Sequence, residues 1–350
     1  MPTAKTRIDW VDYAKGICII LVVMMHSTLG VEKAAGEVSA LGAFVEWARP
    51  FRMPDFFLIS GLFLASRINR PWREYLDGKV LHFVYFYMLW MTIQFGFKGY
   101  GIWQEAGLMG VTQGWLMGFI EPFGTLWFIY LLAVFFVVVK ATRHVPPLLV
   151  FAVGAGLEAA TIDTGWLVID EFASRFVYFF VGYWLAKHVF DFAEGVAARR
   201  PAVILAGLVI WGFGNGLVVN LGWSDAPIVS LAMGFIGAAA VVSTGVLLSK
   251  FRLAEALRYC GENSIVIYLA FFLPMAVSRT VLLKTPLAEN LSAASLMVTA
   301  AGVMVPVALF WMVRNTRGAF LFRRPAWARL ASGSTGWHSA AHVKTQPQAR

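Results

Sequence analysis

The sequence predicts an all-α polytopic membrane protein with about ten transmembrane helices. Of its 350 residues, 59% are hydrophobic and only 14% are charged, whereas a soluble domain carries roughly a quarter charged residues. Apolar runs of about 20 residues recur along the whole chain, and each can cross a hydrocarbon core about 30 Å thick. Helices fit these runs because barrel strands are much shorter and the backbone must satisfy its own hydrogen bonds in lipid.

The expected spans follow one another with short connections. The first is too long for a cleaved signal peptide, and no A-x-A site follows it. The segment 99–121, between the third and fourth spans, is Gly-rich and carries two tryptophans, so we expect an outer loop that dips into the interface. The ten expected spans are 10–30, 43–66, 78–98, 122–140, 146–162, 171–190, 202–220, 227–249, 262–282 and 293–313.

The basic residues predict that both termini lie in the cytoplasm. With the N-terminus inside, 21 of the 29 basic residues, Lys140 among them, fall in cytoplasmic segments and four in outer ones, which is the positive-inside pattern. This topology explains most of the net charge of +9, so no nucleic-acid partner is expected. We expect a membrane domain over 1–314 and a basic, disordered cytoplasmic tail over 315–350, past Trp337 above all.

Four basic residues are not explained by topology, because they lie within the expected spans. An ionisable side chain at the centre of a membrane helix costs about 2.5–3.5 kcal/mol by insertion scales, and it usually faces a protein interior or a wet cavity. These residues are therefore the first candidates for a functional site. They are Lys15, Arg49, Arg52 and Arg175.

Lys15 and His26 lie on one face of the first expected helix. Eleven residues at 100° each make three turns plus about 20°, and they rise by roughly 16 Å. Asp12 joins this face three residues before Lys15. The alternatives are an interfacial Asp12–Lys15 ion pair with a snorkelling lysine and a hydrogen-bonded core position for His26. The shared face favours function, and the ordinary histidine pKa of about 6.5 suits proton transfer.

The second expected span combines charges with prolines. Arg49 and Arg52 are one turn apart, and Pro50 and Pro54 remove backbone donors, so we expect a kinked or broken helix. Carbonyls freed in this way need a protein-lined or wet cavity, where arginine could bind a phosphate or carboxylate. Arg52 and Asp55 are also three residues apart, and the alternative is an internal arginine–aspartate salt bridge that holds two helices together.

Five segments carry a combined pattern of charged, aromatic and small residues: IDWVDYAKGICIILVVMMH (8–26), FRMPDFFLISGLFLA (51–65), GTLWFIYLL (124–132), RFVYFFVGYWL (175–185) and GENSIVIYLAF (261–271). They resemble signatures of the integral-membrane acyltransferase-3 family, in the order expected for that family. The resemblance implies an inner-membrane O-acyltransferase that moves an acyl group onto a glycan or related acceptor outside the cytosol.

Two departures from the family pattern concern the expected site. Many members carry a histidine shortly after the Tyr-Leu pair of the last segment, whereas Ala270 and Phe271 stand here, so His26 lacks that possible helper. Many members also carry Arg-x-x-Arg at the start of the third helix, whereas this chain has Lys79 and His82. The second departure changes the residues that would contact the donor.

The resemblance and the intramembrane charges together predict the roles of nine residues. We expect His26 to act as the general base, with Asp12 as the second catalytic candidate. The expected donor is an acyl coenzyme A, acetyl coenzyme A in the simplest case, with no permanently bound cofactor and no metal. The residues expected to bind donor or acceptor are Lys15, Arg49, Arg52, Arg175, Lys79, Trp127 and Asn263.

Simpler interpretations stay open for several of these residues. Lys79 fits the positive-inside pattern and Trp127 fits the membrane interface, while Asn263 fits a helix cap. The alternative function is a secondary transporter or flippase that uses the same buried charges. Transporters often carry broken helices in corresponding positions of two repeats. Here the charged, proline-containing second span has no late counterpart, because the seventh and eighth expected spans carry no buried charge.

Overall fold

The computed structural model describes residues 8–330, which form helices and connecting loops without a β-strand in that range. The predicted all-α class is confirmed. The helices are α1 (Asp9–Ala35), α2 (Ala40–Gly61), α3 (Trp72–Tyr75), the π-helix η1 (Leu76–Val80), α4 (Leu81–Met117), η2 (Gly124–Leu126), α5 (Trp127–Ala141), α6 (Pro147–Ala159), α7 (Leu167–Trp184), α8 (Ala186–Ala197), α9 (Pro201–Asn220), α10 (Val229–Phe251), α11 (Glu255–Glu262), α12 (Ser264–Ala270), α13 (Phe272–Leu282), η3 (Pro286–Glu289), α14 (Leu291–Val313), η4 (Arg317–Leu321) and η5 (Ala326–Ala328).

Within residues 8–330, six helical segments are long and apolar enough to cross a membrane, and the pair α12 and α13, bent by 57°, gives a seventh candidate. Some of the other expected spans are not matched by a long apolar helix, because the helix there is too short or too charged. Helix α6 has only 13 residues, and α2 and α7 carry four and three charged side chains. Ten spans with cytoplasmic termini therefore stay a prediction.

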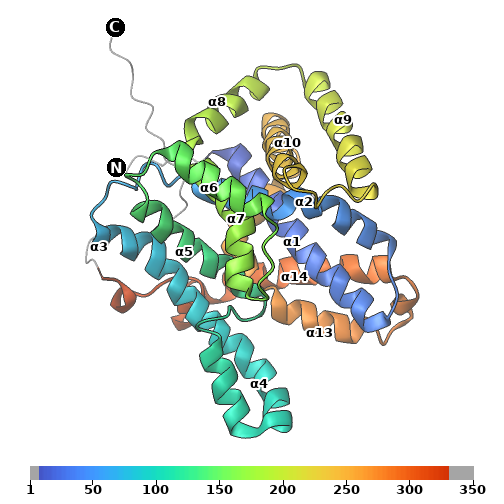
Figure 1. Cartoon of the computed structure of the whole chain (residues 1–350). Coiled ribbons are helices and arrows are strands. Elements are labelled where there is room, and N and C mark those ends of the chain that lie inside the picture. Colours follow the sequence, from blue (N-terminus) through green and yellow to red (C-terminus); the bar gives the residue numbers. More distant parts are fainter. Residues whose placement is uncertain (1–7, 331–350) are drawn as a thin grey trace.

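Helix α1 lies in the middle of the bundle, where it packs against α2, α10, α11 and α14 (Figure 1). Its 27 residues carry Asp9 and Asp12 in the first turn and Lys33 in the last, which complements the helix dipole. The chain leaves the helix through Gly36 at φ 76°, a left-handed conformation that glycine adopts without strain. Helix α9 is peripheral, with 11% of its apolar window buried.

Helices α2 and α7 approach each other through two glycines. A Cβ atom at Gly61 would overlap the carbonyl oxygen of Phe179, and one at Gly182 would overlap the carbonyl oxygen of Leu58. Small residues allow two helix backbones to approach this closely. The contact fixes the α2 segment that carries Arg52 against the helix that carries Arg175.

Of the kinked or broken helix expected around Pro50 and Pro54, the break is absent. The helix runs without interruption through Pro50 and Pro54 from Ala40 to Gly61. A proline removes one backbone hydrogen bond, but its φ near −65° fits a helix. Packing of α2 against α1, α7 and α10 holds this stretch helical.

The expected loop over 99–121 is also wrong. Helix α4 continues to Met117, and the only non-helical backbone inside it is at Gly107, with φ 63° and ψ −166°. The chain reverses there, and the two arms form a hairpin that projects from the body of the molecule (Figure 1). Leu108 and Met109, at the tip, are 71% and 69% exposed.

Residues 317–330, expected in a disordered tail, instead pack against η1 and α4. Arg324 forms an ion pair of 3.0 Å with Asp77, and both side chains are buried. Asp77 also accepts a hydrogen bond of 2.8 Å from the backbone N–H of Leu330. The rest of the expected tail, Trp337 included, lies outside the described residues.

Lys140 is not explained by topology alone. Its side chain is 1% exposed, and its ammonium group donates hydrogen bonds to the backbone carbonyls of Ile68 and Arg70. The ammonium also lies 4.9 Å from the centre of the Tyr75 ring. Lys140 therefore ties α5 to the turn that follows α2.

Candidate functional site

Two cavities lie in series along α1. The first, of about 310 Å³, contains Lys15 and Lys79, and we call it the lysine cavity. The second, of about 210 Å³, contains His26, Arg52 and Arg175, and we call it the histidine cavity. The expected common face of Lys15 and His26 thus leads from one cavity to the other.

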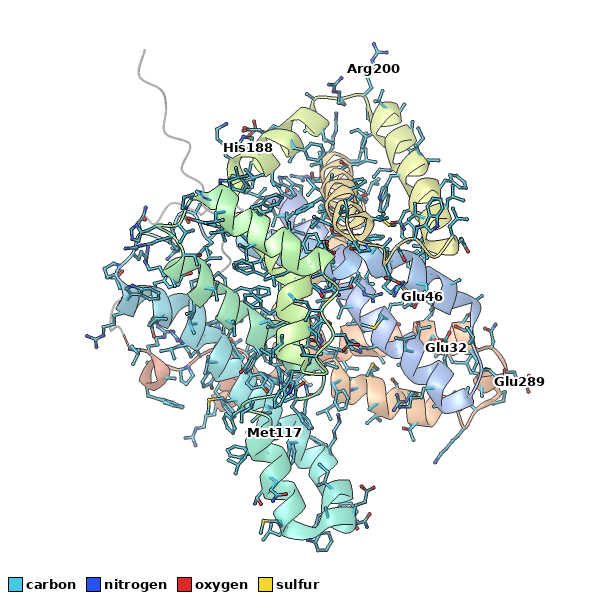
Figure 2. All side chains as sticks on the ribbon, in the orientation of Figure 1. Glu32, Glu46, Met117, His188, Arg200 and Glu289 are labelled. Carbon is cyan, nitrogen blue, oxygen red and sulfur yellow. The ribbon has the colours of Figure 1, made fainter. Side chains whose placement is uncertain are left out.

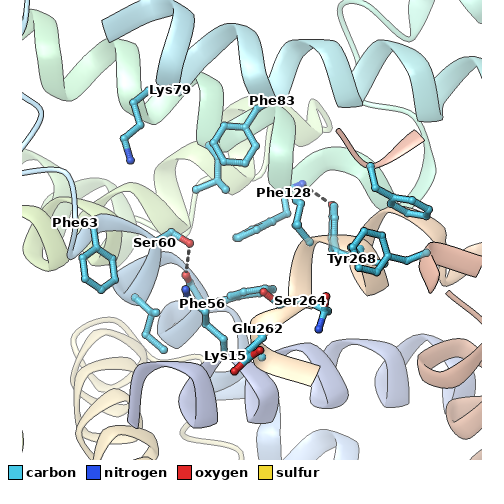
Figure 3. A pocket seen from close by; sticks show the side chains of 18 of the residues that line it. Lys15, Phe56, Ser60, Phe63, Lys79, Phe83, Phe128, Glu262, Ser264 and Tyr268 are labelled. Atoms are coloured by element: carbon cyan, nitrogen blue, oxygen red, sulfur yellow. Dashed lines mark hydrogen bonds between the residues drawn. The ribbon is translucent and has the colours of Figure 1, made fainter. Parts of the chain in front are cut away.

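The lysine cavity is cationic and aromatic. Lys15 lies 3.9 Å from a carboxylate oxygen of Asp12 and 5.8 Å from the centre of the Phe63 ring. Lys79, which is 6% exposed, lies 4.9 Å from the centre of the Phe136 ring. Figure 3 shows the two lysines entering the cavity from opposite walls.

Asp12 and Asn263 stand beside the lysine cavity in different ways. Asp12 is 2% exposed and lines neither cavity, so the structure places it next to Lys15 and away from His26. Asn263 lines the lysine cavity between α11 and α12. Its side-chain amide donates to the carbonyl of Tyr259 at 3.0 Å, so Asn263 caps the end of α11, while it makes no side-chain capping bond to the start of α12.

His26 faces the histidine cavity. Among residues 8–330 it makes no hydrogen bond or ion pair, so it is not the hydrogen-bonded core histidine considered as an alternative. Its ring lies 5.5 Å from the ring of Phe271 at an interplanar angle of 35°. Phe271 is one of the two residues that stand where many acyltransferase-3 proteins have a histidine, and it supplies only an apolar contact.

Arg52 enters the same cavity from α2. Its side chain is 7% exposed, and one guanidinium nitrogen, Nη1, donates to the carbonyl of Val45 at 3.2 Å. Its Nε has no hydrogen-bond partner, and the guanidinium forms no ion pair within the described part of the chain. Both carboxylate oxygens of Asp55 are buried without a partner as well, so Arg52 and Asp55 form no salt bridge with each other.

Arg175 and Trp127 complete the expected residues of the histidine cavity. The Arg175 Nε lies 3.0 Å from a carboxylate oxygen of Glu171, one turn earlier on α7. Trp127 begins α5 and lines the same space. The cavity therefore holds one imidazole, two guanidinium groups and one carboxylate.

Arg49 does not join this group. Its guanidinium is 43% exposed and pairs with Glu46 at 3.1 Å and with Asp225 at 2.7 Å. It also donates to the Ser224 hydroxyl at 3.2 Å. Arg49 thus links α2 to the loop between α9 and α10, and its expected place beside His26 is wrong.

Sequence reasoning missed four residues of this region. Glu171 could have been found, because a carboxylate four residues before an arginine on a helix usually pairs with it. Phe56, Phe128 and Tyr268 line both cavities. In a chain that is 15% aromatic, no sequence pattern marks these three among the others.

The arrangement has the parts that acyl transfer requires. A hydroxyl nucleophile needs a base, and His26 faces a cavity. The tetrahedral intermediate needs a positive or hydrogen-bonding group for its oxyanion, and Arg52 offers an unused N–H donor in the same cavity. The lysine cavity offers the ammonium groups of Lys79 and of Lys15, the latter about three helical turns from His26 on α1, which suits an anionic donor with a long arm.

The comparisons with known proteins agree with this chemistry. A family model described as an acyltransferase domain, of the acyltransferase-3 type, matches residues 8–313. The chain is also similar to the inner membrane protein YcfT of Escherichia coli K12, with 24% identity over 289 residues that cover 75% of this chain and 78% of the relative. No solved structure matches the chain.

Proposed function

Because the chain belongs to the acyltransferase-3 family, we propose that it is an O-acyltransferase of the inner membrane. The donor is a cytosolic acyl coenzyme A, with acetyl or another short acyl group. The acceptor is a hydroxyl of a cell-surface or periplasmic glycan or a related molecule. The inner-membrane location is supported by the similarity to an inner membrane protein of E. coli and by the six apolar helical segments.

One observation carries the proposal: His26 and Arg52 face one cavity, and the other end of the same helix supplies Lys15 to a second, cationic cavity. A base and an oxyanion-binding group are the two elements that acyl transfer needs at the reacting carbon. Lysines bind phosphate groups as point charges. We therefore assign donor binding to the lysine cavity and the chemical step to the histidine cavity.

In the proposed reaction, the acceptor oxygen attacks the thioester carbonyl while His26 takes the hydroxyl proton. The negative oxygen of the tetrahedral intermediate lies against the free N–H of Arg52. The intermediate collapses, the carbon–sulfur bond breaks, and the thiolate of coenzyme A leaves. His26 returns the proton to that thiolate, so the enzyme ends in its starting state.

The expected topology assigns a side of the membrane to each cavity. With both termini in the cytoplasm, the Lys15 end of α1 faces the cytosol and the His26 end faces outward. Figure 2 shows the side chains of His188 and Arg200 near the top of the molecule, whereas Glu32 and Glu289 lie near its right edge. Arg200, which the expected topology assigns to the cytosol, thus lies at a different end of the molecule from the end of α1 that carries Glu32.

The proposal is tested by mass spectrometry of surface and periplasmic glycans and lipids from cells with and without the protein. We expect one class of molecule to lose a defined acyl mass when the protein is absent, and to regain it on expression of the wild-type chain. Unchanged acyl groups, combined with loss of a glycan from the cell surface, would favour the transporter or flippase.

A further inference from the structure

The two cavities share one wall, which is made of three aromatic side chains. Phe56 comes from α2, Phe128 from α5 and Tyr268 from α12, and each of them lines both cavities. They are 6%, 3% and 3% exposed. We call this wall the septum; Figure 3 shows its three members beside one another at the lysine cavity.

The rings of the septum pack against one another. The Phe56 and Phe128 rings are stacked, with centroids 4.5 Å apart and planes inclined by 17°. The Phe128 and Tyr268 rings meet edge to face, with centroids 5.4 Å apart. Such contacts fill space efficiently, so the three rings are placed to limit the passage of water between the cavities.

The three side chains differ in how firmly they are held. The Tyr268 hydroxyl donates to the carbonyl of Thr125 and accepts the backbone N–H of Phe128 at 3.2 Å. Tyr268 is therefore fixed to the start of α5. Phe56 and Phe128 are held by ring packing only, and a phenylalanine can change rotamer without breaking a hydrogen bond.

We propose that Phe56 and Phe128 form a gate against the fixed ring of Tyr268, and that the acyl-bearing arm of the donor must pass this gate. This inference rests on the proposed function. The phosphates of an acyl coenzyme A stay with the ammonium groups of the lysine cavity, and the linear pantetheine arm carries the thioester through the septum toward His26. The gate separates acceptor-side water from the waiting thioester, which limits its hydrolysis.

A cysteine-accessibility experiment tests the gate without reference to any activity. Ser60 lines the lysine cavity only, and Met25 lines the histidine cavity only. Each is replaced by cysteine in a Cys260→Ser background, because Cys18 is fully buried while Cys260 is partly exposed. A small, charged, membrane-impermeant methanethiosulfonate is then added to spheroplasts or to inverted vesicles.

In the protein with an intact septum, we expect Ser60→Cys and Met25→Cys to react from opposite sides of the membrane. With Phe128→Ala or Phe56→Ala added, reagent on a single side of the membrane should modify both cysteines. Phe135→Ala is the matched control, because Phe135 lies two turns after Phe128 on α5, is fully buried and lines neither cavity. It should leave the sidedness unchanged.

Reaction of both cysteines from one side in the protein with an intact septum refutes the gate, and so does unchanged sidedness in folded septum variants. The first of these results needs no septum variant, so it is available even if Phe128→Ala does not fold. Neither result depends on acyl transfer, so they bear on the gate and not on the proposed function.

Acceptor-free release of coenzyme A from acetyl coenzyme A gives a second measurement on purified protein. We expect Phe128→Ala to release it about tenfold faster than the wild type, which corresponds to a barrier lower by about 1.4 kcal/mol. Phe135→Ala should match the wild type. Equal release by Phe128→Ala and the wild type would contradict a water barrier. If no variant released coenzyme A or bound the donor, but Phe128→Ala still let both cysteines react from one side, the gate would stand and the acyl donor would be refuted.

Discussion

Replacing His26 by glutamine tests the proposed base most directly. Glutamine keeps hydrogen-bonding groups in the histidine cavity, but it does not take up a proton near neutral pH. A positioned general base contributes about 10² to 10⁴ in rate, so we expect His26→Gln to lose acyl transfer by that factor. His26→Ala should lose at least as much.

The variant protein should still fold. His26 makes no hydrogen bond or ion pair with another residue of 8–330, so its replacement leaves no described partner unsatisfied. The contact that is lost is with the Phe271 ring, 5.5 Å away, and such pairs are worth about 0.5–1.5 kcal/mol. This cost is small beside a typical domain stability of about 5–15 kcal/mol.

The assay is acyl transfer in isolated membranes, followed by mass spectrometry at protein levels matched by immunoblot. His144→Ala is the control, because His144 is exposed and accepts a hydrogen bond of 2.9 Å from the Nε–H of its neighbour Arg143; it should behave as the wild type. Wild-type rates in His26→Gln would refute the assignment and make Glu171, which lines the same cavity, the next candidate base. Failure of His26→Ala to accumulate would instead indicate a packing role.

Three further changes test other parts of the structure by thermal unfolding in detergent. Coenzyme A should raise the melting temperature of the wild type and of Lys187→Ala, an exposed lysine outside both cavities, but not of Lys15→Ala; equal shifts in both variants would refute the donor site. Lys140→Ala should destabilise the protein by about 2–4 kcal/mol, because two carbonyls lose a charged donor, and an unchanged melting temperature would contradict this anchoring role. Gly182→Ala should cost about 1–3 kcal/mol, because the added methyl group overlaps the Leu58 carbonyl; a neutral effect would show that α2 and α7 can separate.

Helix geometry predicted the part of the site that lies on one helix. The rotation between Lys15 and His26 was sufficient to place both on a common face, because α1 is one uninterrupted helix. The same argument failed for Arg49, one turn before Arg52 on α2. Periodicity gives the direction of a side chain but not the neighbour that it meets, and Asp225 is 176 residues away in the chain.

Other features depend on contacts that sequence patterns do not contain. Lys140 follows the positive-inside pattern, yet it is buried against two carbonyls; charge counts do not separate an anchoring lysine from a solvated one. The sequence predicted a loop over 99–121, but this stretch is helical and only Gly107 leaves the helical conformation, where the chain reverses. Phe56 and Phe128 gain their place between two cavities only when α2 and α5 pack together.

Two helices that are too charged to count as simple apolar spans, α2 and α7, carry part of the candidate chemistry. Helices α2 and α7 supply Arg52, Arg175 and Glu171, and these charges lower their apolar character. A buried guanidinium without an ion pair is unfavourable before the reaction, and Arg52 is in this state although Asp55 is one turn away. If the two had formed a salt bridge, Arg52 would offer less to a developing oxyanion. An unpaired Arg52 gains most when negative charge appears beside it, and only interactions stronger in the transition state than in the ground state raise kcat. The missing salt bridge is therefore what the proposed reaction requires of this residue.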